Sequence, residues 1–149
     1  MYSELFASLQ TTEDRRLLLR ELDLLLQSLY KQNDQSFEKI SEESVRGSTM
    51  THLEKIFQAN PDKDAVLKEI KKLLEGVNIV ELTIALEPTR QLTDRVSGWV
   101  KKNLSEDALI RFEIDKKIVA GAKIIYKGAY HDFSTSKKIV ELTSNGKQS

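Results

Sequence analysis

The spacing of apolar residues changes at Gly76, and this change limits the fold more than any other feature of the sequence. Before Gly76, apolar residues recur every three or four positions, as on one face of a helix. After it, alternate positions are apolar, as in a strand with one buried face: Val80, Leu82, Ile84 and Leu86. A chain of 149 residues with this order predicts an α+β fold.

The same change predicts the domain organisation. We expect a bundle of about three to five helices over residues 1–76. A small domain follows over residues 77–143, with the order β-α-β-β-α and its helices mostly on one face of the sheet. Residues 144–149 are expected to form a disordered tail.

Residues 11–30 are the most leucine-rich segment. Thr11 stands three positions before Asp14, which predicts a helix start with a capping box. Four leucines then fall on one helical stripe: Leu18, Leu22, Leu25 and Leu29. Four others widen this stripe: Leu17, Leu19, Leu24 and Leu26. A helix with so broad an apolar surface must be covered on several sides.

Two further helices are predicted in the first half. One covers residues 47–60, with an apolar face of Met50, Leu53, Ile56 and Phe57. The other begins near Pro61 and ends at Gly76. Its apolar face is formed by Val66, Ile70 and Leu73. The polar segment before them, residues 31–48, is either a loop or a short helix.

The leucines of the first half exceed what so few helices need for a core. Either the surplus packs on the second half of the chain, or a partner helix completes the bundle. The sequence leaves both interpretations open.

In the second half, Pro88 ends the first strand and Thr89 caps the following helix. One face of that helix carries Leu92, Val96, Trp99 and Val100. The next strand places Ile110, Phe112 and Ile114 on one side. A hairpin is predicted from residues 122–126 and 129–133, with its turn at Lys127 and Gly128. Ser134 then starts a last short helix.

Composition excludes several classes of function. The 23 basic and 23 acidic residues balance, which argues against affinity based mainly on phosphate neutralisation. The absence of cysteine excludes disulfides, thiolate metal sites and a cysteine nucleophile. We find no apolar run of about 20 residues and no signal peptide, so we expect a cytosolic protein or one docked to a larger assembly.

The charge is unevenly distributed along the chain. Residues 1–60 carry ten acids and seven bases, whereas residues 115–149 carry three acids and seven bases. This difference predicts two surfaces that face different partners, or lysines that protect sheet edges from aggregation.

The sequence offers little that supports catalysis. His52 and His131 have no partner at a metal-ligand spacing, and the chain has no glycine-rich phosphate-binding motif. His131, Asp132 and Ser134 are adjacent in sequence, which does not make a catalytic triad. Glu113 and Asp115 share one side of a strand without a pocket signal. We therefore expect a non-enzyme without cofactor or metal.

Nucleic-acid binding is an alternative. A hairpin that carries Tyr126, Lys127 and Tyr130 has aromatic rings for stacking on bases and a cation for phosphates. The zero net charge and the small aromatic content argue against it.

The region from residue 115 contains a specific combination of residues. Asp115 precedes the aliphatic pair Ile118 and Val119, and two small residues, Ala120 and Gly121, follow. After the hairpin come Asp132 and Ser134, and Lys138, Ile139 and Leu142 continue in register. This pattern resembles the C-terminal part of the delta subunit of F-type ATP synthases, called the oligomycin-sensitivity-conferring protein in mitochondria. With the upstream strand, the turn at Pro88 and the helix around Trp99, the resemblance covers residues 77–142.

The resemblance implies a mechanical function. Delta subunits belong to the peripheral stalk, which holds the catalytic head still while the rotor turns, so that proton flow drives ATP synthesis. The implied partners are the N-terminal helices of the alpha subunits and the C-terminal stalk helices of the b subunits. The implied location is the cytoplasmic face of the plasma membrane. The family's helical domain is longer than the one available here.

Site residues follow from this resemblance as hypotheses. The leucine stripe would hold the alpha helix: Leu18, Leu22, Leu25 and Leu29. The basic C-terminal region would hold the b stalk: Lys137, Lys138, Ile139 and Leu142. The motif residues would be structural: Pro88, Asp115, Ile118, Gly121, Asp132 and Ser134. An adaptor unrelated to ATP synthase, which would share the leucine-rich helix, is the remaining alternative.

Overall fold

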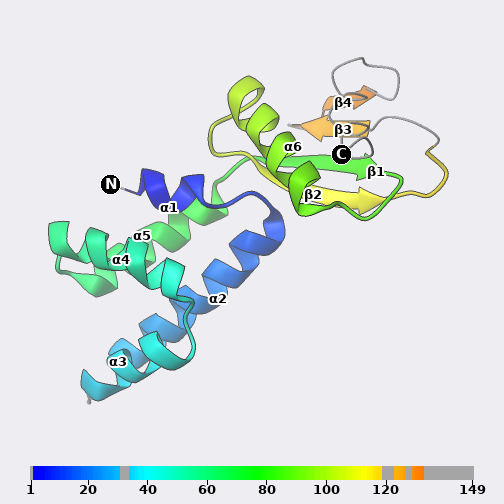
Figure 1. Ribbon diagram of the computed structural model, residues 1–149. Coiled ribbons are helices and arrows are strands. Elements are labelled where there is room, and N and C mark those ends of the chain that lie inside the picture. Colours follow the sequence, from blue (N-terminus) through cyan, green and yellow to red (C-terminus); the bar gives the residue numbers. More distant parts are fainter. Residues whose placement is uncertain (1, 31–33, 119–122, 127–128, 133–149) are drawn as a thin grey trace. The chain divides into compact units, whose positions relative to one another are not determined.

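A computed structural model describes residues 2–30, 34–118, 123–126 and 129–132 (Figure 1). It has an α+β fold, as predicted. The chain divides into two compact units. The first comprises residues 1–9 and 13–76, and the second comprises residues 10–12 and 77–149. Among the described residues no helix is both long enough and apolar enough to cross a membrane.

The helices of the first unit are α1 (Ser3–Ala7), α2 (Thr12–Leu29), α3 (Asp34–Glu43), α4 (Gly47–Ala59) and α5 (Lys63–Glu75). The short helix α1 was not predicted, and it adds Leu5 to the core. The segment that the sequence left open contains the short helix α3. Helix α5 begins at Lys63 and not at Pro61, because the Asp62 carboxylate accepts a hydrogen bond from the Ala65 N–H at 3.1 Å.

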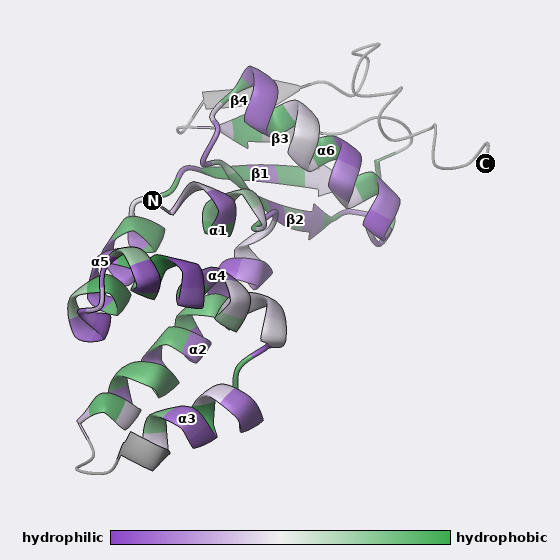
Figure 2. Ribbon diagram, turned by 60° about the vertical axis from the view of Figure 1, so that its left-hand side comes forward, coloured by the Kyte–Doolittle hydropathy of each residue, from purple (hydrophilic) through white to green (hydrophobic). Residues whose placement is uncertain are grey.

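The core of the first unit consists mainly of leucine. Figure 2 shows how densely apolar residues follow one another along α2. The buried side chains of α2, α4 and α5 include Leu18, Leu22, Leu25, Leu26, Leu53, Ile56, Val66, Leu67, Ile70 and Leu74. Leu73, predicted with this set, is 44% exposed because the buried face of α5 is centred on the side of Ile70 and Leu74. Its place in the core is taken by Leu67.

Helix α4 is held at its N-terminus by a carboxylate from α2. Glu21 is buried, and its side chain accepts a hydrogen bond from the Arg46 backbone N–H at 2.6 Å. It also accepts hydrogen bonds from the Arg46 guanidinium at 2.7 Å and from the Thr49 hydroxyl at 3.1 Å. The pKa of Arg46 is raised mainly by this hydrogen bond from its side chain to Glu21. The Glu21 carboxylate of α2 therefore accepts a hydrogen bond from a backbone N–H at the start of α4 that has no partner within its own helix.

The second unit contains β1 (Ile79–Ile84), α6 (Arg90–Asn103), β2 (Leu109–Ile114), β3 (Lys123–Tyr126) and β4 (Ala129–Asp132). The sheet order is β2-β1-β3-β4. Strand β1 pairs parallel with β2, from Ile79 opposite Leu109 to Ile84 opposite Ile114. It pairs antiparallel with β3, which forms the predicted hairpin with β4. The predicted turn at residues 127–128, the helix from Ser134 and the tail lie outside the described residues.

Residues 10–12 belong to the second unit because they pair with the edge of its sheet. The Ile110 N–H donates to the Gln10 carbonyl at 2.9 Å, and Thr11 forms a parallel bridge with Ile110. The Gln10 side chain also donates to Asp94 of α6 at 2.8 Å. From the sequence, Thr11 was predicted only as the start of a helix, since a bridge between residues so distant in sequence leaves no local signal.

One face of the sheet packs against α6 (Figure 1). The core of this unit is Val80, Leu82, Ile84, Val96, Val100, Ala108 and Ile110, with Leu92, Trp99, Leu104, Phe112 and Tyr126 packed against it. The predicted faces of β1 and α6 are thus confirmed. The prediction that Leu86 and Ile114 belong to the buried faces of their strands was wrong, because their side chains are 62% and 41% exposed. Leu86 lies beyond the last paired residue of β1, and Ile114 ends an edge strand.

The predicted cap of α6 is confirmed, and it provides a test of the fold of the second unit. The Thr89 hydroxyl accepts a hydrogen bond from the Leu92 N–H at 3.1 Å. We expect Thr89→Ala to lower the free energy of unfolding by about 1 kcal/mol, and Thr89→Ser to preserve most of it. Urea denaturation followed by the fluorescence of Trp99, the single tryptophan, measures both. Equal losses in the two variants would mean that the hydroxyl does not cap α6.

Candidate functional site

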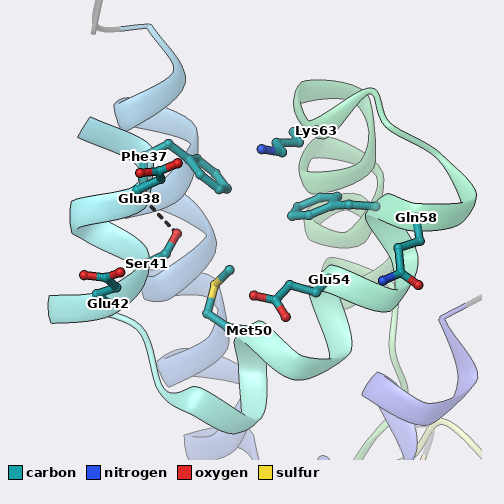
Figure 3. A pocket seen from close by; sticks show the side chains of 9 residues that line it. Phe37, Glu38, Ser41, Glu42, Met50, Glu54, Gln58 and Lys63 are labelled. Atoms are coloured by element: carbon teal, nitrogen blue, oxygen red, sulfur yellow. Dashed lines mark hydrogen bonds between the residues drawn. The ribbon is translucent and has the colours of Figure 1, made fainter. Parts of the chain in front are cut away.

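A groove of about 480 Å³ lies between α3, α4 and the start of α5 in the first unit. Figure 3 shows the side chains that line it. They are Phe37, Glu38, Ser41 and Glu42 of α3, Met50, Glu54, Phe57 and Gln58 of α4, and Lys63 of α5. We refer to it as the α3–α4 groove.

The floor of the groove is apolar. Phe37 and Phe57 meet edge to face, with ring centroids 6.3 Å apart and planes inclined by 60°. Met50 lies seven residues before Phe57 on α4, and all three side chains are only partly buried. Aromatic rings and methionine are the side chains that most often anchor protein partners, because they offer large apolar area and adaptable shape.

The rim of the groove is charged. Glu38 and Glu42 lie one turn apart on α3, and Glu54 lies on α4; all three are exposed. Lys63 is the basic residue of the lining, and its Nζ lies 4.3 Å from the centre of the Phe37 ring and 5.8 Å from that of Phe57. Lys63 is thus within cation–π distance of both rings. The lining thus has three acidic groups and one basic group.

The groove has the features of a binding surface for a protein segment. Its acidic groups stand at the rim around an apolar floor. Such an arrangement can cover the apolar side of a bound segment, while the polar side chains of that segment contact the charged rim. No group of three or more histidine, aspartate or glutamate side chains in the described part of the chain is placed to hold a metal ion.

Neither the protein-family models nor the curated proteins with which the sequence was compared give a match. We therefore infer function from this chain's own residues and from the resemblance of residues 77–142 to the delta subunits of F-type ATP synthases.

The leucines predicted to bind a partner helix lie mostly in the core. Leu22 and Leu25 are 0% exposed and Leu18 is 1% exposed, so these three do not form a surface groove. Leu29 is partly buried. The repeat identified the apolar side of α2, but it could not show that this side packs within the chain.

Two further partly exposed leucines, Leu17 and Leu24, lie on another side of α2. Leu17 and Leu24, two turns apart, line a second depression of about 430 Å³ together with Arg20, Glu21, Ser44 and Arg46. The exposed charged residues of this depression are basic, Arg20 and Arg46, because Glu21 is buried and paired with Arg46.

The motif residues of the second unit are only partly within the described chain. Asp115 follows β2, where its N–H donates to the Ile84 carbonyl at 2.8 Å and its carboxylate accepts from the Lys117 N–H at 2.9 Å. Ile118 closes that turn, and Pro88 lies between β1 and α6. Asp132 ends β4. Outside the described residues lie Gly121, Ser134, Lys137, Lys138, Ile139 and Leu142.

Among the described residues, two of those considered for catalysis or nucleic-acid binding have contacts within their own unit: His52 and Tyr126. Nδ1 of His52 lies 2.8 Å from the Ser48 carbonyl within its own helix. Tyr126 packs against the core of the second unit, and its hydroxyl donates to the Leu104 carbonyl at 3.4 Å. Lys127 and the side chains of Tyr130 and His131 lie outside the described structure.

The sequence predicted only part of the groove floor. It placed Met50 and Phe57 on the apolar face of α4 but assigned them to the core. Phe37 and Lys63 were missed, because the segment around Phe37 is polar and weakly patterned. A single aromatic residue on an otherwise charged short helix was the available signal.

Proposed function

We propose that this chain is a delta-type subunit of an F-type ATP synthase, a non-catalytic part of the peripheral stalk at the cytoplasmic face of the plasma membrane. In this role the helical unit binds the N-terminal helix of an alpha subunit. The second unit binds the C-terminal helices of the b stalk. Holding both together keeps the catalytic head stationary while proton flow turns the rotor.

The order of elements in the second unit is the observation that supports this proposal most. Strand β1, helix α6, strand β2 and the hairpin β3–β4 follow one another in the order that the resemblance implies. One residue of the resembling motif lies at a joint between strands: the Asp115 N–H donates to the Ile84 carbonyl, which ties the end of β2 to the end of β1.

The helical unit supports a binding role through its surface and not through its core. The buried leucines of α2 are already packed within the chain. The α3–α4 groove instead offers partly exposed aromatic rings, which fit the apolar side of an amphipathic helix.

The proposal is tested by titrating the full chain with two peptides from the same organism, the alpha N-terminus and the b C-terminus, by calorimetry at physiological salt. We expect saturable one-to-one binding of each peptide, and binding of both at once. Reversing the charge at Lys137 and Lys138 is expected to weaken only the b peptide, because stalk helices are rich in charge. If neither peptide binds, the stalk role is wrong and an unrelated adaptor becomes the better assignment.

A further inference from the structure

The α3–α4 groove lies beside a core that is already complete. Leu22, Leu53 and Ile70 are 0% exposed, so the interior of the helical unit is covered within the chain. Phe37, Met50 and Phe57 nevertheless keep apolar surface in contact with water. Covering this surface with a ligand is favourable because it removes apolar area from water.

The dimensions of the groove fit a helix. Met50 and Phe57 lie seven residues apart on α4, about 10 Å along the helix axis. That length corresponds to two turns of a partner helix, which would present apolar residues at positions i, i+3, i+4 and i+7. A volume of about 480 Å³ has room for several such side chains.

The acidic rim of the groove favours a bound helix with basic flanks. Glu38 and Glu42 stand on the α3 side of the floor, and Glu54 comes from the α4 side (Figure 3). A helix whose apolar stripe is flanked by lysine or arginine would pair with both walls. A helix with acidic flanks would place like charges against both of them, which disfavours binding.

We propose that the α3–α4 groove binds a basic amphipathic helix of another protein. The apolar side of this helix lies on Phe37, Met50 and Phe57, and its flanking cations pair with Glu38, Glu42 and Glu54. The inference rests on the proposed function in assigning helix binding to the helical unit, and it adds the location of the site and the charge of its ligand.

The first test uses two labelled helical peptides of about 18 residues, long enough to form a helix. Both carry leucine at i, i+3, i+4 and i+7; one has lysine on the flanks and the other has glutamate. Fluorescence anisotropy with the full chain is expected to show at least roughly tenfold tighter binding of the lysine peptide. Its Kd should rise with ionic strength, because exposed charges are screened by salt. Equal binding of both peptides would overturn the proposal.

The second test locates the site. The triple change Glu38→Gln, Glu42→Gln and Glu54→Gln is expected to raise the Kd of the lysine peptide roughly tenfold. The matched control changes three exposed acids of the second unit by the same net charge: Glu87→Gln, Glu106→Gln and Glu113→Gln. The control should leave the Kd unchanged. If it weakens binding equally, the attraction is a long-range effect of net charge and the groove is not the site.

A third variant tests the floor. Phe37→Ala removes the ring that contacts both Phe57 and Lys63, and it is expected to weaken the lysine peptide roughly tenfold or more. Far-UV circular dichroism verifies that the variant is folded. Unchanged affinity in a folded Phe37→Ala protein would contradict the proposed contact.

The alpha and b peptides separate this inference from the proposed function. If they bind the wild-type chain and the triple glutamine variant equally well, the stalk role stands and the groove inference is wrong. If neither binds while the lysine peptide binds in a groove-dependent way, the groove inference stands and the stalk role is wrong.

Discussion

Leu22→Ala is expected to lower the free energy of unfolding of the helical unit by about 2–5 kcal/mol. Leu22 is 0% exposed in the middle of α2, so truncation leaves a cavity among side chains that cannot fully collapse into it. Leu73→Ala is the matched control, since Leu73 is 44% exposed and its loss should cost less than about 1 kcal/mol.

Urea denaturation followed by far-UV circular dichroism measures this difference, with the fluorescence of Trp99 recorded in parallel as a report on the second unit. Similar losses for Leu22→Ala and Leu73→Ala would contradict the assignment of Leu22 to the core. Leu22→Asp would bury an unpaired charge and is expected to unfold the unit. Loss of partner binding in that variant would therefore report unfolding and not a lost contact.

Glu21→Gln is expected to destabilise the helical unit by about 2 kcal/mol, the usual cost of losing hydrogen bonds to a charged acceptor. Glu21 accepts from the Arg46 N–H, the Arg46 guanidinium and the Thr49 hydroxyl. Glutamine has the same shape, but its amide N–H₂ would face one of these donors. The measurement is the urea midpoint of the variant against wild type.

Two comparisons identify which of these bonds matters most. Arg46→Ala keeps the backbone N–H, and the Arg46 side chain is 48% exposed, so we expect a smaller cost of about 0–1 kcal/mol. Glu13→Gln breaks an exposed pair with Arg16 and is expected to change stability little. If Arg46→Ala costs as much as Glu21→Gln, the ion pair stabilises the unit more than the capping of α4 does.

These two predictions bear on function, because they separate the residues that hold the helical unit together from those available to a partner. Core leucines and Glu21 maintain the bundle. The partly exposed rings of Phe37 and Phe57, with the acidic side chains beside them, remain accessible to a partner. Variants for binding studies should therefore be made in the α3–α4 groove.

Much of the second unit could be predicted from sequence because its signals are local. The alternation of Val80, Leu82 and Ile84 gives β1 its buried face, and that face is the same whichever strands flank β1. Thr89 caps α6 through a bond to a residue three positions away. In the first unit, Gly76 ends α5 in the same local way. Patterns within one turn or one strand need no knowledge of the rest of the chain.

The tertiary structure alone decided which apolar surface remains exposed. The sequence showed that α2 has leucines on several sides, and packing determined that Leu18, Leu22 and Leu25 are buried while Leu17 and Leu24 are partly exposed. It also brought Phe37 to Phe57, and Thr11 to Ile110, across many residues. Burial depends on contacts between segments far apart in sequence, so hydrophobic periodicity predicts which face of a helix is apolar but not what covers it.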